Sequence, residues 1–251
     1  MSTLAVIPAR LGATRLPSKP LRLLGGSPLI LRVWERMQKM RVADRVVVAT
    51  DAIEVLDVCR SAGAEAVITR SDHPSGTDRV AEVAAMARFV GFDVIVNVQG
   101  DEPYVPEDAV AGAVKLVASG RFVLGTAAAP ADAAAQQDPG VVKVVTDDTG
   151  RAMYFSRAPI PFLRDGGDAG SLAPVIRRHI GVYAYQRAAL ARWVALPPHP
   201  LELVERLEQL RPLAAGIPMG VVTIGPVAGG GIDTEEDLAL ANALWTEHHL
   251  G

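Results

Sequence analysis

The 251-residue sequence has one cysteine, Cys59, and 5 % aromatic residues. A single cysteine excludes an intrachain disulfide framework and any metal site built from several thiolates. No stretch reaches the roughly 20 uncharged apolar residues that span a membrane. After Met1 only residues 4–7 form an apolar run before Pro8, which is too short for the core of a signal sequence. We therefore expect a cytoplasmic protein without membrane insertion.

An excess of one charge sign is lacking as well, because 25 Lys and Arg face 28 Asp and Glu. Proteins that bind duplex nucleic acid broadly usually show a strongly basic face, so no nucleic-acid partner is expected. Two common nucleotide-binding loops are also missing. Neither G-x-x-x-x-G-K-[ST] nor a G-x-G-x-x-G that follows a strand occurs, which disfavours P-loop NTPases and Rossmann dehydrogenases.

Hydrophobic residues make up 49 % of the chain, enough for a sizeable core. Nearly continuous Val- and Ile-rich runs, typical of buried parallel strands, alternate with longer amphipathic segments. The predicted strands are 4–8, 45–50, 66–69, 93–98 and 123–128, and the predicted helices are 28–40, 53–62, 78–90 and 106–119. This alternation predicts an α/β fold, with a mostly parallel sheet and helices on both faces.

The alternation breaks after about residue 130, where strands are expected at 141–146, 153–156 and 180–185 between polar, Gly/Pro-rich turns. A helix over 201–215, a strand over 220–224 and a helix over 237–248 complete the chain. We interpret the stretch at about 130–190 as a small protruding lobe inserted in a single domain that spans residues 1–251.

Ligands of open parallel sheets bind beyond the carboxyl ends of the strands, so the loops after strands are of most interest. The first such loop contains Arg10, Arg15 and Lys19, with Gly12 permitting a tight backbone. Three cations and free backbone N–H groups suit a polyphosphate. The alternative is a solvated basic loop without a ligand.

Two carboxylates form the second candidate. Asp101 directly follows the predicted strand 93–98, where it would face the basic loop; an oxygen ligand beside a phosphate site suggests Mg²⁺. Asp233 follows a glycine run, while Thr234 and Asp237 have the spacing of a capping pair for the last helix. Asp233 is thus free to be a second metal ligand, although both carboxylates could instead serve only as turn and capping residues.

Further polar clusters have the character of recognition elements. They are residues 72–79, 155–158, 178–183 and 205–211. In the last of them Glu205 and Gln209 would share one helix face at i, i+4. Each cluster can also be structural, and His179 in particular could be a satisfied histidine at a strand end.

These motifs together resemble the 3-deoxy-manno-octulosonate (Kdo) cytidylyltransferases, also called CMP-Kdo synthetases. The segments that carry the resemblance are 7–21, 73–79, 97–103, 155–158, 201–211 and 231–238, which span nearly the whole chain in the same order. The resemblance implies a nucleotidyltransferase-type, Rossmann-like fold whose protruding lobe serves homodimerisation. It also implies transfer of a cytidylyl group from CTP to the anomeric hydroxyl of Kdo, giving CMP-Kdo and pyrophosphate for lipopolysaccharide synthesis.

The same resemblance assigns roles to individual residues. Catalytic roles fall to Asp101, Asp233, Lys19 and Arg10, and the two aspartates would hold Mg²⁺. The nucleotide would be bound by Ala9, Arg10, Arg15, Lys19, Thr50, Asp51, Ser75, Gly76 and Gln99. The sugar would be recognised by Gln99, Arg157, His179, Tyr183, Glu208 and Gln209. The family usually has serine where this chain has Ala13, which puts one phosphate contact in doubt.

Three alternatives stay open at this point. A CMP-sialic acid synthetase shares the chemistry, but its loop differs from the Arg15–Lys19 stretch found here. A relative that uses 8-amino-Kdo would differ in a few side chains of the sugar site. A sugar-nucleotide-binding regulator without catalysis would be expected to lose a metal carboxylate, yet both Asp101 and Asp233 are present.

Overall fold

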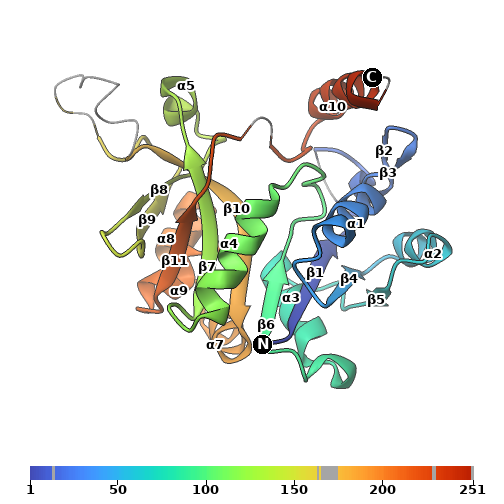
Figure 1. Cartoon of the computed structure of the whole chain (residues 1–251), viewed down its shortest axis with the longest axis horizontal. Coiled ribbons are helices and arrows are strands. Elements are labelled where there is room, and N and C mark those ends of the chain that lie inside the picture. The colour runs from blue at the N-terminus through green and yellow to red at the C-terminus, as the bar shows by residue number, and fades with distance from the viewer. Residues whose placement is uncertain (13–14, 163, 165–174, 228–229, 250–251) are drawn as a thin grey trace. The chain divides into compact units, whose positions relative to one another are not determined.

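The computed structural model describes residues 1–12, 15–162, 164, 175–227 and 230–249. Ala13 and the turn at 165–168 therefore lie outside the described residues. The chain forms two compact units, Met1–Val105 with Gly229–Gly251, and Pro106–Ala228 (Figure 1). Within the described residues no helix is long and apolar enough to cross a membrane.

The first unit is built on a parallel sheet, as predicted. Its strand order is β6 (Val94–Asn97), β1 (Thr3–Ala9), β4 (Arg45–Thr50) and β5 (Ala66–Ile68). Neighbouring strands all run parallel. Every residue of β1 is buried, although successive side chains point to opposite faces of a sheet. Both faces are therefore covered, which explains why the strand is apolar throughout rather than alternating.

The helices of this unit are α1 (Leu29–Met40), α2 (Ile53–Ser61) and α3 (Gly76–Ala85). Helix α3 begins two residues before the predicted start because the Ser75 hydroxyl caps it, accepting a hydrogen bond from the Asp78 amide. It also ends earlier than the predicted 90, since Met86 is extended and a short 3-10 helix, η2 (Ala87–Phe89), follows.

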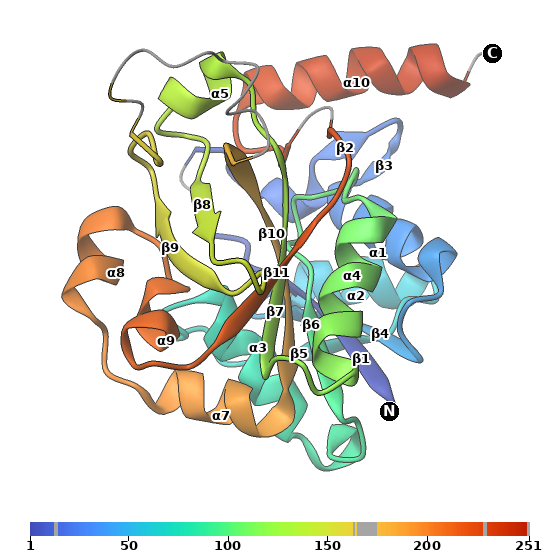
Figure 2. The same cartoon turned by 60° about the vertical axis from the view of Figure 1, so that its left-hand side comes forward.

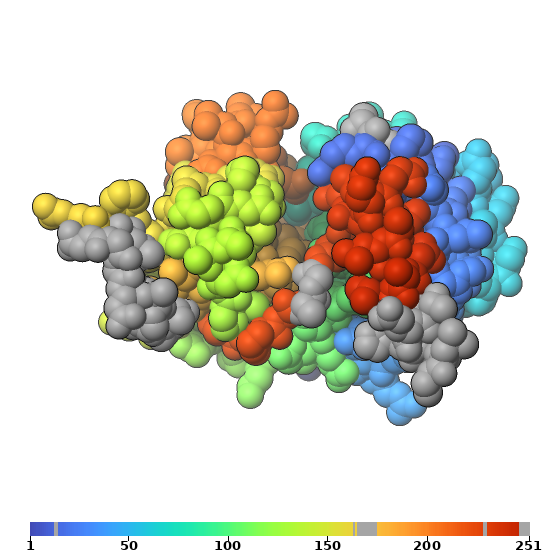
Figure 3. All heavy atoms as spheres, turned by 90° about the horizontal axis from the view of Figure 1, so that it is seen from above, coloured from blue at the N-terminus to red at the C-terminus, as the bar shows by residue number. Residues whose placement is uncertain are grey.

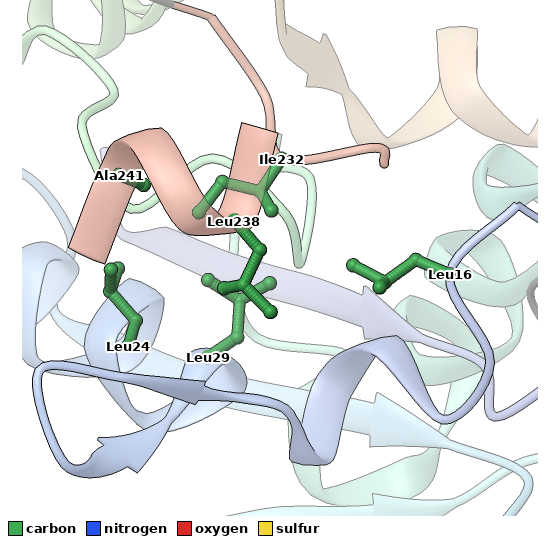
Figure 4. Close-up of a cluster of buried hydrophobic side chains, with 6 residues drawn as sticks. All are labelled: Leu16, Leu24, Leu29, Ile232, Leu238 and Ala241. Carbon is green, nitrogen blue, oxygen red and sulfur yellow. The ribbon is translucent and has the colours of Figure 1, made fainter. Parts of the chain in front are cut away.

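Three small elements between β1 and α1 were not predicted. They are the 3-10 helix η1 (Lys19–Leu21) and the strands β2 (Leu23–Leu24) and β3 (Ser27–Pro28). Helix α10 (Glu235–His249) packs over this region of the same unit (Figure 3). The contact is a cluster of buried apolar side chains shown in Figure 4: Leu16, Leu24, Leu29, Ile232, Leu238 and Ala241.

The second unit has a mixed sheet (Figure 2). Strands β7 (Leu124–Pro130) and β11 (Met219–Thr223) are parallel, whereas β10 (Arg177–Gln186) is antiparallel to β7. Strands β8 (Lys143–Thr146) and β9 (Ala152–Ser156) continue the antiparallel pairing from β10. Helix α4 (Glu107–Ala118) packs on this sheet at two glycines: Gly125 lies under the Ala113 carbonyl, and Gly112 lies against Val222.

The segment 201–215, predicted as one helix, forms two short helices instead. The remaining helices of this unit are α5 (Ala133–Gln137), α7 (Arg187–Ala195), α8 (Pro200–Glu205) and α9 (Leu210–Ala214). Helix α8 ends at Glu205, and the chain turns at Arg206, whose φ of 56° is left-handed, before α9 begins. The corner is held by a buried ion pair in which the Arg211 guanidinium donates to both Glu202 carboxylate oxygens, at 2.5 and 2.8 Å. Glu205 and Gln209 therefore do not share a helix face.

We expect Gly125→Ala to lower the free energy of unfolding by about 1–3 kcal/mol, the usual cost of overpacking a core. A Cβ atom at this position would lie 2.6 Å from the Ala113 carbonyl oxygen, which belongs to the backbone and moves only with α4. The matched control is Gly91→Ala, where nothing lies within 4 Å of the added atom. Denaturant unfolding of both variants checks the prediction, and equal stabilities would contradict it.

Candidate functional site in the first unit

The basic loop after β1 is fixed by apolar anchors. Leu16 is fully buried and packs in the cluster of Figure 4 with Ile232 and Leu238. Pro20, which follows Lys19 in η1, is buried as well. The segment with the cations is thereby pinned against the segment that leads into α10, which is why residues about 215 positions apart in the sequence meet.

Lys19 lies between the two aspartates that the sequence singled out. Its ammonium donates to Asp101 Oδ2 at 2.5 Å and to Asp233 Oδ1 at 2.7 Å. Arg15 adds a second cation, 3.0 Å from Asp233 Oδ2. Burial works to lower the pKa of Lys19, but the two carboxylates outweigh it and the pKa is raised. The ammonium therefore stays charged.

Asp101 is placed by a close approach of two strand ends. A Cβ atom on Gly100 would lie 2.7 Å from the Pro8 carbonyl oxygen, so only glycine lets the loop after β6 run this close to the end of β1. The Asp101 carbonyl then accepts a hydrogen bond from the Ile232 amide at 2.9 Å. The backbone thus joins the two segments that carry the carboxylates.

Asp233 is oriented by the cap of α10, and the predicted capping pair is confirmed. The Thr234 hydroxyl accepts from the Asp237 amide at 3.1 Å. In return Asp237 Oδ2 accepts from the amides of Asp233 and Thr234, each at 2.9 Å. Burial alone would raise the pKa of Asp237, yet these hydrogen bonds lower it, so the cap carries a negative charge. The Asp233 side chain is left to face Lys19.

This donor set fits a hard cation such as Mg²⁺. Within the described residues no group of three His, Cys, Asp or Glu side chains has the geometry of a metal site. Mg²⁺, however, is usually held by one or two carboxylates and completes its octahedron with water and phosphate oxygens. Two carboxylates already converge on one positive charge, the Lys19 ammonium, which marks the position where a cation is stabilised.

The predicted nucleotide-binding residues lie around the strand ends of this unit. Arg10 is exposed directly after β1, and Ala9 is buried at the end of that strand. Gly76 is the first residue of α3 and lies next to Gln99: a Cβ atom on Gly76 would be 3.8 Å from Gln99 Oε1. Gly76 and Gln99 therefore lie side by side, with Ser75 directly before Gly76 in the chain.

Two members of the predicted nucleotide set are occupied by structural contacts. Asp51 accepts a hydrogen bond from the buried Arg79 guanidinium at 2.9 Å. Thr50 is fully buried and its hydroxyl accepts from the Ala52 amide at 3.2 Å. Arg79 also donates to the Thr69 hydroxyl at 2.5 Å and thereby links the ends of β4 and β5 to α3. The sequence placed Arg79 in the polar cluster 72–79, whereas the structure shows it buried with Asp51 and Thr69 as its partners.

A second group of predicted residues in the second unit

The predicted sugar-binding residues other than Gln99 lie in the second unit. Arg157 follows β9, and Glu205 fixes it from α8: the Arg157 amide donates to Glu205 Oε2 at 2.9 Å, and its Nε donates to the Glu205 carbonyl at 2.8 Å. The other Glu205 oxygen accepts from the Ser156 hydroxyl at 2.6 Å. Glu205 is therefore a support for Arg157, a role that sequence spacing did not reveal.

A buried lysine supports the same place. Lys143 is fully buried, and its ammonium donates to three backbone carbonyls, those of Asp138, Val141 and Arg157, at 2.6–2.8 Å. Burial lowers the pKa of Lys143. This residue was missed because a lysine in a strand has no sequence signal that distinguishes a buried side chain from an exposed one.

His179 and Tyr183 lie together on β10. Their ring centroids are 5.4 Å apart, and Phe155 of β9 meets the His179 ring edge-on at 5.0 Å. Burial lowers the pKa of His179 to about 3, so the ring is neutral. The pKa of Tyr183 is raised by burial and, to a smaller degree, by Tyr185 and Glu208. Glu208 thus belongs to the same neighbourhood, whereas Gln209 is buried at the start of α9.

A parallel α/β unit with a basic loop and two carboxylates at the ends of its strands is typical of nucleotidyltransferases. A family model described as cytidylyltransferase matches residues 4–221. The chain is 61 % identical to the 3-deoxy-manno-octulosonate cytidylyltransferase of Gemmatimonas aurantiaca, with 99 % of this chain and 96 % of the relative covered. It is 45 % identical to the protein of the same name from Herminiimonas arsenicoxydans, with 98 % and 100 % covered. The chain belongs to the cytidylyltransferase family.

Solved structures agree. A CMP:2-keto-3-deoxy-manno-octonic acid synthetase complexed with CTP matches with a TM-score of 0.91 and 36 % identity, over 99 % of this chain and 100 % of that one. A putative glucose-1-phosphate thymidylyltransferase from Bacillus anthracis, solved with sucrose, has a TM-score of 0.66 at 15 % identity, with 97 % and 95 % covered. The second likeness bears on the fold alone. The predicted family and the α/β nucleotidyltransferase-type fold are confirmed.

We expect Lys19→Gln to bind Mn²⁺, a spectroscopic substitute for Mg²⁺, about tenfold more tightly than the unchanged protein in the absence of nucleotide. The substitution removes the ammonium that neutralises Asp101 and Asp233 and so leaves both carboxylates to an added cation. Electron paramagnetic resonance titration of free Mn²⁺ measures the affinity. Arg45→Gln, which removes a cation paired with Glu65 away from this site, is the control. Weaker Mn²⁺ binding in Lys19→Gln would contradict the fit of a cation to this pair.

Proposed function

We propose that this protein transfers the cytidylyl group of CTP to the anomeric 2-hydroxyl of Kdo, giving CMP-Kdo and pyrophosphate for lipopolysaccharide synthesis. The observation that carries the proposal is the convergence of Lys19, Asp101 and Asp233 at the strand ends of a cytidylyltransferase fold. The Kdo acceptor is supported by relatives of that name at 45–61 % identity over nearly the full chain.

The reaction needs positioning and charge neutralisation rather than a covalent intermediate. The sugar hydroxyl gives up its proton to solvent and its oxygen forms a bond to the α-phosphorus. The bond from that phosphorus to the bridging oxygen breaks, and pyrophosphate leaves with the electron pair. Arg10, Arg15 and Lys19 supply positive charge for the triphosphate. Arg15 and Lys19 are already held beside the carboxylates, at 3.0 and 2.7 Å from Asp233. Their position suits the charge that develops on the leaving group.

Mg²⁺ is the cofactor of this proposal. Asp101 and Asp233 would hold it, and the ion would lower the pKa of the attacking hydroxyl and stabilise negative charge on the phosphates. The chain's own part is to keep the two carboxylates converged. The Ile232 amide bound to the Asp101 carbonyl and the Asp237 cap on Asp233 do this through the backbone.

Sugar recognition is assigned to Arg157, His179, Tyr183 and Glu208, with Gln209 and Gln99 as further candidates. Arg157 offers its guanidinium, and Glu205 holds this residue in place by accepting hydrogen bonds from its backbone amide and its Nε. The neutral His179 ring and Tyr183 offer hydrogen-bonding atoms next to apolar ring faces, a combination that suits a sugar.

We further propose a cytoplasmic homodimer that uses the lobe at about 130–190 and its surroundings. Large apolar side chains are exposed in this unit, among them Phe162 at 82 % and Val204 at 83 %. Where such side chains form a contiguous patch, the patch marks a protein–protein interface. Light scattering of the purified protein tests the dimer: Phe162→Ser and Val204→Ser should shift the mass toward that of a monomer.

Pyrophosphate release from CTP with Mg²⁺ tests the function, with Kdo, 8-amino-Kdo and sialic acid offered separately. Release with Kdo far above that with the other two sugars is expected. A preference for 8-amino-Kdo or sialic acid would keep the chemistry and change the acceptor. Binding of CTP without release for any sugar would instead identify a binding protein.

Asp101→Asn should lower kcat by about two orders of magnitude or more, the size of effect seen when transition-state electrostatics are lost. The side chain keeps its shape but loses the charge that faces Lys19. Asp57→Asn, on the exposed face of α2, is the matched control and should leave kcat unchanged. Turnover of Asp101→Asn close to that of the unchanged enzyme would remove Asp101 from the metal role.

A further inference from the structure

Thr126 lies at an interruption of the sheet in the second unit. Strands β7 and β10 pair regularly up to Ile180 opposite Ala127, and then the register shifts so that Tyr183 lies opposite Thr126. The buried Thr126 hydroxyl faces the interruption, with its Oγ1 2.7 Å from the Val182 carbonyl oxygen and 3.4 Å from the Ile180 carbonyl oxygen.

The same hydroxyl is 2.8 Å from His179 Nε2. A threonine hydroxyl has one proton to donate and lone pairs that accept. The Val182 carbonyl can only accept, so the hydroxyl proton points to it. His179 Nε2 must then carry a proton and donate to Oγ1. The opposite arrangement would leave the lone pairs of two oxygens facing each other at 2.7 Å.

The other ring nitrogen, Nδ1, is consequently an acceptor. The His179 ring is neutral because burial between Phe155 and Tyr183 lowers its pKa to about 3, so it holds one proton, which is on Nε2. His179 is half-buried as a residue, and among the described residues its hydrogen bond to Thr126 is made through Nε2 and not through Nδ1.

We infer that Thr126 is a positioning residue: it fixes His179 in the tautomer with the proton on Nε2, so that Nδ1 accepts a hydrogen bond from a hydroxyl of the sugar. This inference rests on the proposed role of His179 in sugar binding. It also divides the tasks within the site. A lone pair on Nδ1 repels a carboxylate, so His179 accepts a hydrogen bond from a hydroxyl of the sugar. The carboxylate of the sugar must then be bound by hydrogen-bond donors of other residues.

The tautomer can be measured directly in the unchanged protein. Nitrogen-15 NMR of the histidine-labelled protein distinguishes a protonated ring nitrogen from an unprotonated one, and the His179→Gln variant identifies which signals belong to residue 179. We expect a protonated Nε2 and an unprotonated Nδ1 between pH 6 and pH 8, the range around the ordinary histidine pKa of about 6.5. A proton on Nδ1 would overturn the inference whatever the activity.

Two substitutions test the consequence for the sugar. Thr126→Ser keeps the hydroxyl and should keep both the tautomer and the KM for Kdo. Thr126→Val keeps the shape without the hydroxyl; it should populate both tautomers and raise the KM for Kdo about tenfold, with the KM for CTP unchanged. If Thr126 had a purely structural role, Thr126→Val would raise the KM values for both Kdo and CTP or for neither. Either result would overturn the inference. Should Thr126→Val fail to fold, the spectrum of the unchanged protein and the Thr126→Ser kinetics decide.

The His179→Gln variant separates this inference from the proposed function. Pyrophosphate release with Kdo in the unchanged protein establishes the function by itself. An unchanged KM for Kdo in His179→Gln, together with the expected tautomer, overturns the sugar-binding role of His179 and the inference with it. If His179→Gln raises the KM for Kdo but the unchanged protein carries the proton on Nδ1, His179 keeps its role in sugar binding. Only the positioning role of Thr126 is then overturned.

Discussion

The ammonium of Lys19 between Asp101 and Asp233 joins three segments that are far apart in the sequence. Two carboxylates this close repel each other, so they stay converged only while a cation lies between them. In the protein alone that cation is Lys19; under the proposed function the two carboxylates would hold Mg²⁺, and the lysine charge would then serve the phosphates. The Lys19 ammonium thus keeps the two carboxylates together in the protein alone.

This charge cluster depends in turn on apolar packing. Leu16 places the loop, Ile232 and Leu238 place the entry to α10, and all three lie in one cluster (Figure 4). At its far end the helix is seated closely, since a Cβ atom on Gly25 would lie 2.1 Å from Trp245 Nε1, and the Arg32 guanidinium covers the Trp245 ring at 4.4 Å. Burial supplies the free energy that holds charged groups at a defined spacing.

Much of the first unit could be predicted because its signals are local. The apolar run at β1 and the capping pair at α10 each follow from a few neighbouring residues. The break at Arg206 could not be predicted, because it depends on Glu202 pairing with Arg211 after the chain has turned. The partners of Asp51 and Arg157 were missed for the same reason: Arg79 and Glu205 reach them from other elements, and no periodicity reports such contacts.

The seating of α10 also has a consequence for the dynamics of the site. The Asp237 cap that orients Asp233 belongs to α10, which packs against β2 rather than in the central sheet, and such peripheral elements commonly open more often than the centre of a sheet. Since Leu16 and Leu238 share one cluster, detachment of the helix would expose the anchor of the basic loop at the same moment. Amide hydrogens of the two segments should then exchange with solvent through one common opening event, so that the basic loop and the last helix behave as a single cooperative unit.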